Sequence, residues 1–262
     1  MINILALETT GKYGSAAVIK EDGSVYCASS ETEMNHLKDI ITISDEAVKE
    51  AGITKKELTH VAASAGPGSF TGIRIGVTTA RTLGQMLGIP CIAVSSLEAM
   101  ARRVLSDAVA AGALYVVPVI NARRHQTYAG AWQAVFTSDG EKQSIISEMP
   151  EKQYMIEGLL DELTGKVSEN AGKVFFTGDG IDAYGEIIEG AFDAKGIRGQ
   201  LILADEGIRY QDAGSVAEIA LGKAERGDTL TYDRLLPEYM RLSEAEQRLR
   251  DGTLSDKIKK AR

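Results

Sequence analysis

Cysteine, proline and basic residues are scarce in this sequence, and the shortages exclude several classes of protein. Of the 262 residues, 2 are cysteine and 5 are proline. Cys27 and Cys91 allow at most one disulfide, and because both lie in apolar strand patterns we expect buried free thiols in a reducing compartment. Lys and Arg number 29 against 37 Asp and Glu, which gives a net charge of −8. Such a chain is a poor stand-alone binder of nucleic acid.

Long hydrophobic runs are also missing. The apolar stretches are shorter than the roughly 20 residues that a membrane-spanning helix needs. Met1-Ile-Asn-Ile enters a strand pattern directly, without the basic region and cleavage site of a signal peptide. With 44% hydrophobic and 25% charged residues, the composition is typical of a globular domain. We therefore expect a cytoplasmic globular protein with no membrane segment.

The hydrophobic pattern alternates between strands and helices in an order that occurs twice. Three strands are followed by helix, strand, helix, strand and helix in both rounds, without a repeat of the sequence itself. Helices between strands imply parallel pairing, and the leading hairpins imply an antiparallel edge. We therefore predict an α/β fold of two mixed sheets covered by helices. The expected strands are 2–7, 14–20, 24–30, 59–65, 91–94, 114–120, 126–136, 143–147, 173–177 and 201–204, and the expected helices are about 37–51, a segment ending near 87, 96–110, 152–164, 181–192 and 213–226.

Two subdomains follow from this order. The seam between the rounds lies near residues 105–113. We predict an N-terminal subdomain at 1–108, completed by the C-terminal helix near 213–226, and a second subdomain at 109–242. Residues 243–262 have no apolar stripe and predict a frayed helix or tail.

The motif GPGSFTG at 66–72 is the most informative local signal. It follows a strand and opens a helix, so backbone N–H groups and the positive helix end could hold a phosphate. It lacks the Lys and Ser/Thr of a Walker loop, and taken alone it is more typical of a tight turn. The candidate nucleotide-loop residues are Glu8, Thr9, Gly66, Gly68, Ser69 and Thr71.

The helix after this motif has a small residue at every fourth position. These residues are Gly72, Gly76, Ala80, Gly84 and Gly88. Each interior glycine costs about 1 kcal/mol relative to alanine, so another interaction should offset the loss. A ridge of small residues permits close approach of a second backbone. Packing on the chain's own first helix or sheet and docking of another protein both remain open.

The segment NARRHQTY at 121–128 joins two predicted strands. Arg123, Arg124 and His125 lie beside aromatic residues and could touch RNA. A solvated hairpin tip is the more ordinary explanation, and it is the one we favour.

No metal or nucleophile site is predicted. His36, His60 and His125 have no second ligand at a reliable spacing. Ser64 and Ser69 do not belong to a G-x-S-x-G motif, and no His/Asp arrangement supports a serine nucleophile. We therefore assign no metal ligand and no catalytic residue.

Four stretches together carry a family resemblance. They are ILALETTGKYGSAAV at 4–18, GPGSFTGIRIG at 66–76, NARRHQTYAG at 121–130 and PEYMRLSEAE at 237–246. They resemble the TsaB (YeaZ) family, the bacterial partner proteins in threonylcarbamoyladenosine synthesis on tRNA. The resemblance spans nearly the whole chain, with Asn121 where the family usually has Asp. It implies an actin-like (ASKHA) fold of duplicated halves, in agreement with the repeated order of elements.

This family is itself similar to a paralogue, TsaD, the subunit that transfers the threonylcarbamoyl group. TsaD has two metal-binding histidines in an HHMEGH stretch, where this sequence reads SSLEAM with Ser96 and Met100 at the ligand positions. The metal-binding Asp of TsaD would correspond to Asp212. Serine and methionine bind hard or borderline divalent ions poorly, so the resemblance implies no transfer chemistry in this chain. Residues 10–13, TGKY, replace SCDE of TsaD and weaken the case for tight ATP binding.

The resemblance therefore predicts a non-catalytic scaffold that pairs with TsaD and is joined by the ATPase TsaE. ATP and a metal are expected in the partner subunits, tRNA is reached only through the complex, and the chain alone is expected to form a homodimer. One alternative is a small-molecule kinase or acyltransferase of the ASKHA superfamily, with Glu8, Asp179 and Asp212 as candidate carboxylates. Another is a purely homodimeric structural protein. The predicted TsaD-docking residues, on the first and second helices, are Leu37, Ile41, Gly72, Gly76, Ala80 and Gly84.

Overall fold

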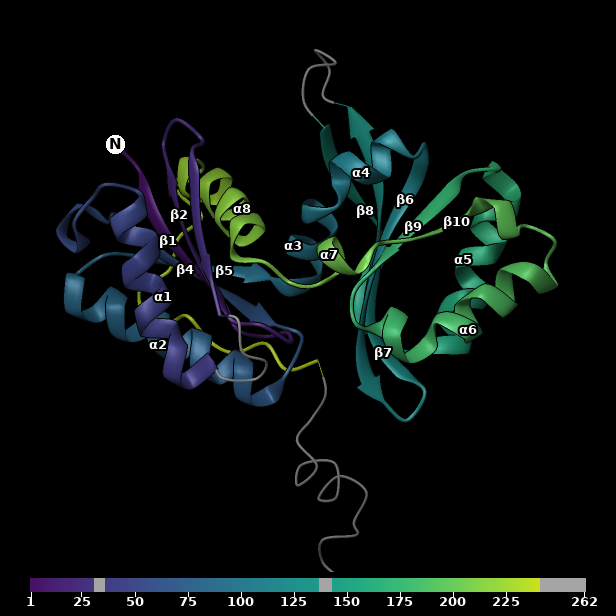
Figure 1. The fold of residues 1–262 in the computed structure, drawn as a ribbon, viewed down its shortest axis with the longest axis horizontal. Coiled ribbons are helices and arrows are strands. Elements are labelled where there is room, and N and C mark those ends of the chain that lie inside the picture. The colour runs from purple at the N-terminus through teal and green to yellow at the C-terminus, as the bar shows by residue number, and fades with distance from the viewer. Residues whose placement is uncertain (31–35, 137–142, 241–262) are drawn as a thin grey trace, which may run out of the picture.

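The computed structural model describes residues 1–30, 36–136 and 143–240, and these form two halves built on the same plan (Figure 1). Each half contains one five-stranded sheet, with strand order β3-β2-β1-β4-β5 in the first and β8-β7-β6-β9-β10 in the second. The strands of the first sheet are β1 (Asn3–Glu8), β2 (Ser15–Lys20), β3 (Val25–Ser29), β4 (His60–Gly66) and β5 (Cys91–Ser95). Those of the second are β6 (Ala113–Arg123), β7 (Gln126–Phe136), β8 (Gln143–Met155), β9 (Lys173–Thr177) and β10 (Leu201–Leu203).

The strand directions match as well as the strand order. In both halves the first three strands pair antiparallel, and the fourth and fifth join in parallel. A parallel neighbour requires a crossover connection, which the intervening helices supply. The predicted α/β fold of duplicated, mixed sheets is therefore confirmed.

Helices cover both faces of the first sheet (Figure 1). Leu5 and Leu7 of β1 pack on the side of α1 (His36–Glu50) and α2 (Phe70–Leu87), whereas Ile4 and Ala6 pack on the side of α8 (Ala213–Glu225). With both faces buried, β1 has no polar face, and this explains its uninterrupted apolar sequence. The last helix of the described part of the chain thus packs on the sheet that contains the N-terminal strand β1.

The second half has its own core. Apolar residues of α3 (Ser96–Arg103) and α4 (Leu105–Ala110) pack against β6, β7 and β8 in one buried cluster that includes Trp132 and Met149. The other helices of this half are α5 (Ile156–Asn170), α6 (Gly180–Ala194) and the short α7 (Glu206–Arg209). Two 3-10 turns complete the described elements, Lys55–Glu57 and Arg198–Gln200.

Three expectations from the sequence need correction. The single helix predicted at 96–110 is two helices, because the backbone breaks at Val104 (φ −97°, ψ 6°) while Val104 and Leu105 both stay in the core. The helix predicted at 152–164 begins at Ile156, because residues 152–155 extend β8 and pair with β7. Both thiols are free, but only Cys91 is buried, since Cys27 lies exposed on the edge strand β3.

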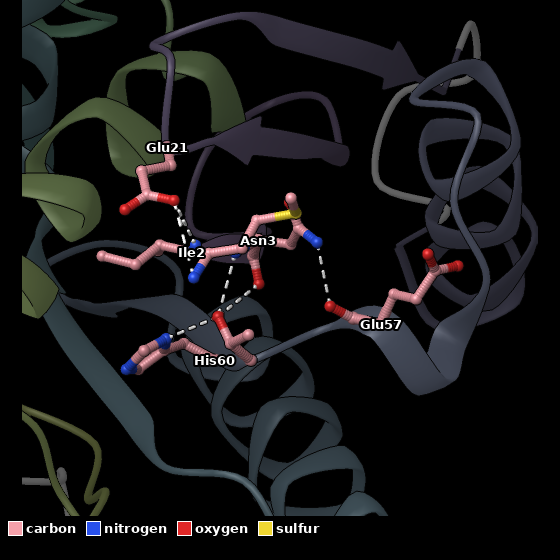
Figure 2. Close-up of polar contacts among 7 residues, drawn as sticks. Ile2, Asn3, Glu21, Glu57 and His60 are labelled. Atoms are coloured by element: carbon pink, nitrogen blue, oxygen red, sulfur yellow. Dashed lines mark hydrogen bonds and ion pairs between the residues drawn. The ribbon is translucent and has the colours of Figure 1, made fainter.

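The start of β1, the middle strand of the first sheet, is fixed by polar contacts (Figure 2). The Glu21 carboxylate accepts a hydrogen bond from the Ile2 N–H at 3.3 Å. The side-chain amide of Asn3 donates to the backbone carbonyl of Glu57 at 3.0 Å. These contacts hold β1 in place just before its parallel pairing with β4 begins at Ile4 and His60.

A C-terminal strap, residues 228–240, returns from α8 to the first half. Leu230 and Cys91 exchange two backbone hydrogen bonds of 2.8 Å, and Leu235 is fully buried. The Glu238 N–H donates to the Ala65 carbonyl at 2.7 Å. The strap therefore reaches the end of β4, next to the GPGSFTG motif.

None of the helices in the described part of the chain combines the length and the apolar character needed to cross a bilayer.

Candidate functional site

A cleft of about 960 Å³ lies between the two halves and collects most of the polar motifs. Its walls come from the loop after β1, the start of α2, the turn between β6 and β7, the start of α6 and the end of the strap. The charged residues that line it are Lys12, Arg123, Arg124, Asp179, Asp182 and Glu238.

The predicted nucleotide-loop residues separate into two layers. Gly68, Ser69 and Thr71 line the cleft, and the Ser69 side chain caps α2 by accepting from the Gly72 N–H at 3.3 Å. Glu8, Thr9 and Gly66 are buried and do not line it. Gly66, at φ 129°, is where the Glu238 carbonyl of the strap approaches too closely for a Cβ.

Glu8 is a buried structural carboxylate. Burial raises its pKa above the usual range, although hydrogen bonds from Ser64 and Thr10 oppose the shift. One carboxylate oxygen accepts from the Thr10 N–H at 2.5 Å and from the Thr10 hydroxyl at 2.6 Å, and the other accepts from the Ser64 hydroxyl. Glu8 therefore links the loop after β1, through Thr10, to β4, through Ser64, and does not itself line the cleft.

The small residues of α2 face the chain's own first half. The Gly72 carbonyl accepts from the Thr9 hydroxyl at 2.7 Å, and a Cβ on Gly76 would lie 2.5 Å from that hydroxyl oxygen. A Cβ on Gly84 would lie 2.5 Å from the sulfur of Cys91. Of the two explanations left open by the sequence, close packing within the chain therefore accounts for the ridge.

This placement corrects part of the predicted docking surface. Gly72, Gly76, Ala80 and Gly84 are buried in this structure, so we assign them to packing within the chain rather than to the docking surface. Ile41, in contrast, is 53% exposed on the outer side of α1. The side chain of Leu37 lies outside the described part of the structure. Docking through the outer side of α1 stays a prediction.

The basic turn between β6 and β7 has an unusual backbone. Arg123, Arg124 and His125 have φ values of 64°, 55° and 59°. Left-handed conformations cost non-glycine residues roughly 1–2 kcal/mol each, and two-residue hairpin turns with positive φ usually carry Asn or Gly. The turn is exposed, as expected for a hairpin tip, but Arg123 and Arg124 also line the cleft.

Asn121 holds this turn in place. Its side-chain oxygen accepts from the Arg123 N–H at 2.8 Å and from the Tyr184 hydroxyl at 3.0 Å. Its own N–H donates to Asp179 at 3.0 Å. His125 points elsewhere, with its ring nitrogen 3.0 Å from Glu157. The sequence did not identify Asn121 and Tyr184 as partners because they lie 63 residues apart in the chain.

The three candidate carboxylates do not meet in the cleft. Asp179 lines it, and burial raises the pKa of Asp179 to about 6. Asp212 caps α8 through the Gly214 N–H at 2.8 Å and forms an ion pair with Arg103 at 3.1 Å. Glu8 lies beneath, with its hydrogen bonds already made. Only one of the three is therefore available to a molecule bound in the cleft.

The residues at the TsaD-like ligand positions do not fit a divalent metal. Ser96 and Met100 are buried, and the Ser96 oxygen accepts from the Thr10 hydroxyl at 3.1 Å. Met100 belongs to the apolar core of the second half. Within residues 1–30, 36–136 and 143–240, no three His, Cys, Asp or Glu side chains are grouped to hold a metal ion.

Comparisons with known proteins agree with this architecture. The model of the family TsaD, tRNA N6-adenosine threonylcarbamoyltransferase, matches residues 28–248. The chain is 29% identical to the "tRNA threonylcarbamoyladenosine biosynthesis protein TsaB" of Bacillus subtilis (strain 168) over 249 residues, which are 94% of this chain and 96% of the relative. It is 25% identical to the Escherichia coli (strain K12) protein of the same name over 256 residues, 95% of this chain and 98% of the relative.

A solved structure resembles the whole fold. The structure of YeaZ from Pseudomonas aeruginosa superposes with a TM-score of 0.67 at 21% identity, and the match covers 91% of this chain and 100% of that one. At this level of identity the similarity concerns the fold alone. The same arrangement of two duplicated halves is thus present in both proteins.

Proposed function

Because this chain belongs to the family that the TsaD model describes, and within it to the TsaB (YeaZ) group of tRNA threonylcarbamoyladenosine biosynthesis proteins, we propose that it is a non-catalytic scaffold subunit. In this role it pairs with TsaD and supports transfer of the threonylcarbamoyl group to the adenosine beside the tRNA anticodon. TsaE joins the pair, and ATP and the metal belong to the partner subunits. The chain on its own forms a homodimer.

The observation that carries this proposal is which residues occupy the positions that correspond to the metal ligands of TsaD. Two imidazoles are replaced by a buried hydroxyl, Ser96, and a buried thioether, Met100. The third position, Asp212, pairs with Arg103 at 3.1 Å. Hard divalent ions prefer carboxylate ligands and borderline ones also prefer imidazole, and the guanidinium of Arg103 already neutralises the one carboxylate. This packing favours a structural role over transfer chemistry.

The docking surface that we propose is the outer side of α1 and α2. Ile41 and Met86 are 53% and 78% exposed there, although the helices on which they lie are otherwise packed on the first sheet. Contiguous exposed apolar patches mark interaction surfaces, and we propose that these two side chains belong to such a patch. The buried glycines of α2 support this surface indirectly, because they let the helix lie close to Thr9 and Cys91.

Reconstitution tests the proposal. We expect no threonylcarbamoyl transfer to tRNA by the purified chain, and transfer once TsaD and TsaE are added. The threonylcarbamoyl adenylate, labelled in its threonine moiety, is supplied as the donor, and incorporation of the label into tRNA measures the product. Size-exclusion chromatography with TsaD, with and without ATP, measures the pairing. A mixture of TsaD and TsaE without this chain is the matched control. Turnover by the lone chain would contradict the scaffold role.

A second prediction concerns metal content. The purified chain is expected to retain less than a stoichiometric amount of any divalent metal after dialysis, because Ser96 and Met100 offer no suitable ligand. Elemental analysis of the chain and of TsaD treated in the same way provides the comparison. One tightly held zinc or iron ion per chain would contradict this expectation.

An enzyme that acts in its own cleft is the second candidate function. The cleft volume of about 960 Å³ and the pKa of about 6 for Asp179 favour it, because a carboxylate with such a pKa suits proton transfer near neutral pH. A small-molecule kinase or acyltransferase of the ASKHA superfamily would use this group. Turnover by the lone chain that is lost in Asp179→Asn would support this candidate over the scaffold.

A further inference from the structure

The turn between β6 and β7 presents two arginines in a strained but well-held conformation. Arg123 and Arg124 adopt φ values of 64° and 55°, where glycine or asparagine is the usual choice. The Asn121 side chain fixes the turn from one side, and the Ile156 N–H donates to the His125 carbonyl at 2.8 Å from the other. Strained backbone of this kind gathers at functional sites. The two arginine side chains therefore need an explanation beyond the turn itself.

Their charges are uncompensated within the described chain. Neither Arg123 nor Arg124 forms an ion pair with a carboxylate in the part of the chain that the structure describes. Other arginines do pair, among them Arg103 with Asp212, Arg198 with Glu189 and Arg209 with Asp182. Two adjacent, exposed guanidinium groups on a protein with a net charge of −8 form a local site for an anion.

An exposed aromatic cluster lies on the other side of the same cleft. Phe70 and Tyr239 both line it, and their rings are stacked with centroids 4.8 Å apart. The Arg74 guanidinium lies 4.0 Å from the Phe70 ring and donates to the Tyr239 hydroxyl at 2.8 Å. Phe70 and Tyr239 are still 45% and 40% exposed. Exposed rings beside basic groups are the combination that single-stranded nucleic acid uses.

We propose that Arg123 and Arg124 contact phosphodiester groups of the tRNA within the assembled complex, and that Phe70 and Tyr239 offer a stacking surface to an unpaired base. The inference rests on the proposed function, because it concerns the RNA on which that complex acts. The net charge of −8 means that this chain would bind tRNA poorly by itself. Two arginines cannot hold a tRNA alone, so the contact adds to binding that TsaD provides.

An RNA strand fits these observations better than a free nucleotide. Asp179, Asp182 and Glu238 share the cleft with the two arginines, and their carboxylates would repel the phosphates of a nucleotide lodged among them. A strand that passes along the rim of the cleft would meet the exposed arginines with its phosphates, while one unpaired base reaches the exposed rings of Phe70 and Tyr239. The geometry therefore favours a polymer over a small ligand.

The test uses the double variant Arg123→Gly with Arg124→Gly. Glycine adopts positive φ without strain, so the variant should keep or raise the melting temperature while it loses both charges. The assembled complex with TsaD and TsaE is titrated with an unmodified tRNA transcript between 50 and 200 mM salt, and binding is followed by fluorescence anisotropy. We expect weaker binding and a slope of log K against log salt that is shallower by about 1.5, as for the loss of two phosphate contacts.

A matched control removes two charges elsewhere. Lys56→Gln with Lys195→Gln neutralises two exposed lysines away from the cleft, and its salt slope should equal that of the unaltered complex. If the glycine variant does not fold, Arg123→Asn with Arg124→Asn repeats the test, because asparagine also tolerates positive φ.

Three results would overturn the inference. Equal tRNA affinity and salt slope in the variant and unaltered complexes would show that the turn does not contact RNA. Loss of affinity for a labelled ATP analogue with tRNA binding intact would assign the turn to a nucleotide. Loss of pairing with TsaD would assign it to the protein interface. Failure of the unaltered chain to pair with TsaD at all would count against the proposed function instead.

Discussion

Replacing Gly72 by Ala is expected to lower the free energy of unfolding by about 3 kcal/mol or more, which is a large part of the stability of a typical domain. A Cβ at this position would overlap the backbone carbonyl oxygen of Thr9. That backbone cannot move away easily, because the Thr9 hydroxyl donates to the Gly72 carbonyl at 2.7 Å and Thr10 is held by Glu8. Urea unfolding of the isolated chain, followed by circular dichroism, measures the change.

Gly190→Ala is the matched control for this substitution. Gly190 lies inside α6, and nothing lies within 4 Å of the Cβ it would gain. Helix propensity alone then applies, and the substitution should stabilise the chain by about 1 kcal/mol. A loss of stability for Gly72→Ala together with a gain for Gly190→Ala would show that close packing, and not helix propensity, determines the effect at Gly72.

Gly84→Leu extends the same test to the other end of α2. The Cys91 sulfur, at 2.5 Å, and the Ile89 carbonyl, at 3.2 Å, leave no room for a side chain there, so the isolated chain should lose stability whether or not TsaD is present. If Gly72→Ala and Gly84→Leu instead keep their stability and lose only TsaD binding, the glycine ridge faces the partner and our assignment of it is wrong.

The sequence predicted the duplicated fold because its evidence is local. The apolar run of β1 and the helical spacing (i, i+3, i+4) of the apolar residues in α1 each follow from the burial of one segment, and the order of the segments can be read along the chain. A sequence pattern does not predict the structure of a segment whose conformation depends on pairing with a distant strand. Residues 148–155 read EMPEKQYM and contain Pro150, yet they belong to β8 because β7 pairs with it on both sides of a register shift that leaves Pro150 unpaired.

The site was less predictable for a related reason. The GPGSFTG motif and the basic turn were each identified, but they belong to different halves, and only the folded chain brings them to one cleft. The spacing of Gly72, Gly76 and Gly84 is the same for a helix that packs inward and one that docks outward. Only the positions of Thr9 and Cys91 distinguish the two cases. A usable signal was present at Arg123–His125, where a tight hairpin contains neither Gly nor Asn.

The second large effect is expected from Asp179→Asn, and it depends on pH. Burial raises the pKa of Asp179 from 3.8 to about 6 in the folded chain. Between these two values the unfolded chain has lost a proton that the folded chain keeps. The free energy of unfolding therefore falls as the pH rises from about 4 to about 6, and the loss persists at pH 7. At about 1.4 kcal/mol per pH unit, this loss amounts to at most about 3 kcal/mol.

Asparagine removes the ionisation but keeps an oxygen that can accept the Asn121 N–H, now 3.0 Å from the carboxylate. The variant should therefore be more stable than the unaltered chain at pH 7 by about 2–3 kcal/mol, and the advantage should shrink towards pH 4. Urea unfolding at several pH values measures both. Asp193→Asn, on the exposed end of the same helix, controls for the loss of one negative charge. If the stabilities of the variant and the unaltered chain run parallel between pH 4 and 6, then Asp179 ionises at an ordinary pKa, and the cleft exposes it to water more than its burial implies.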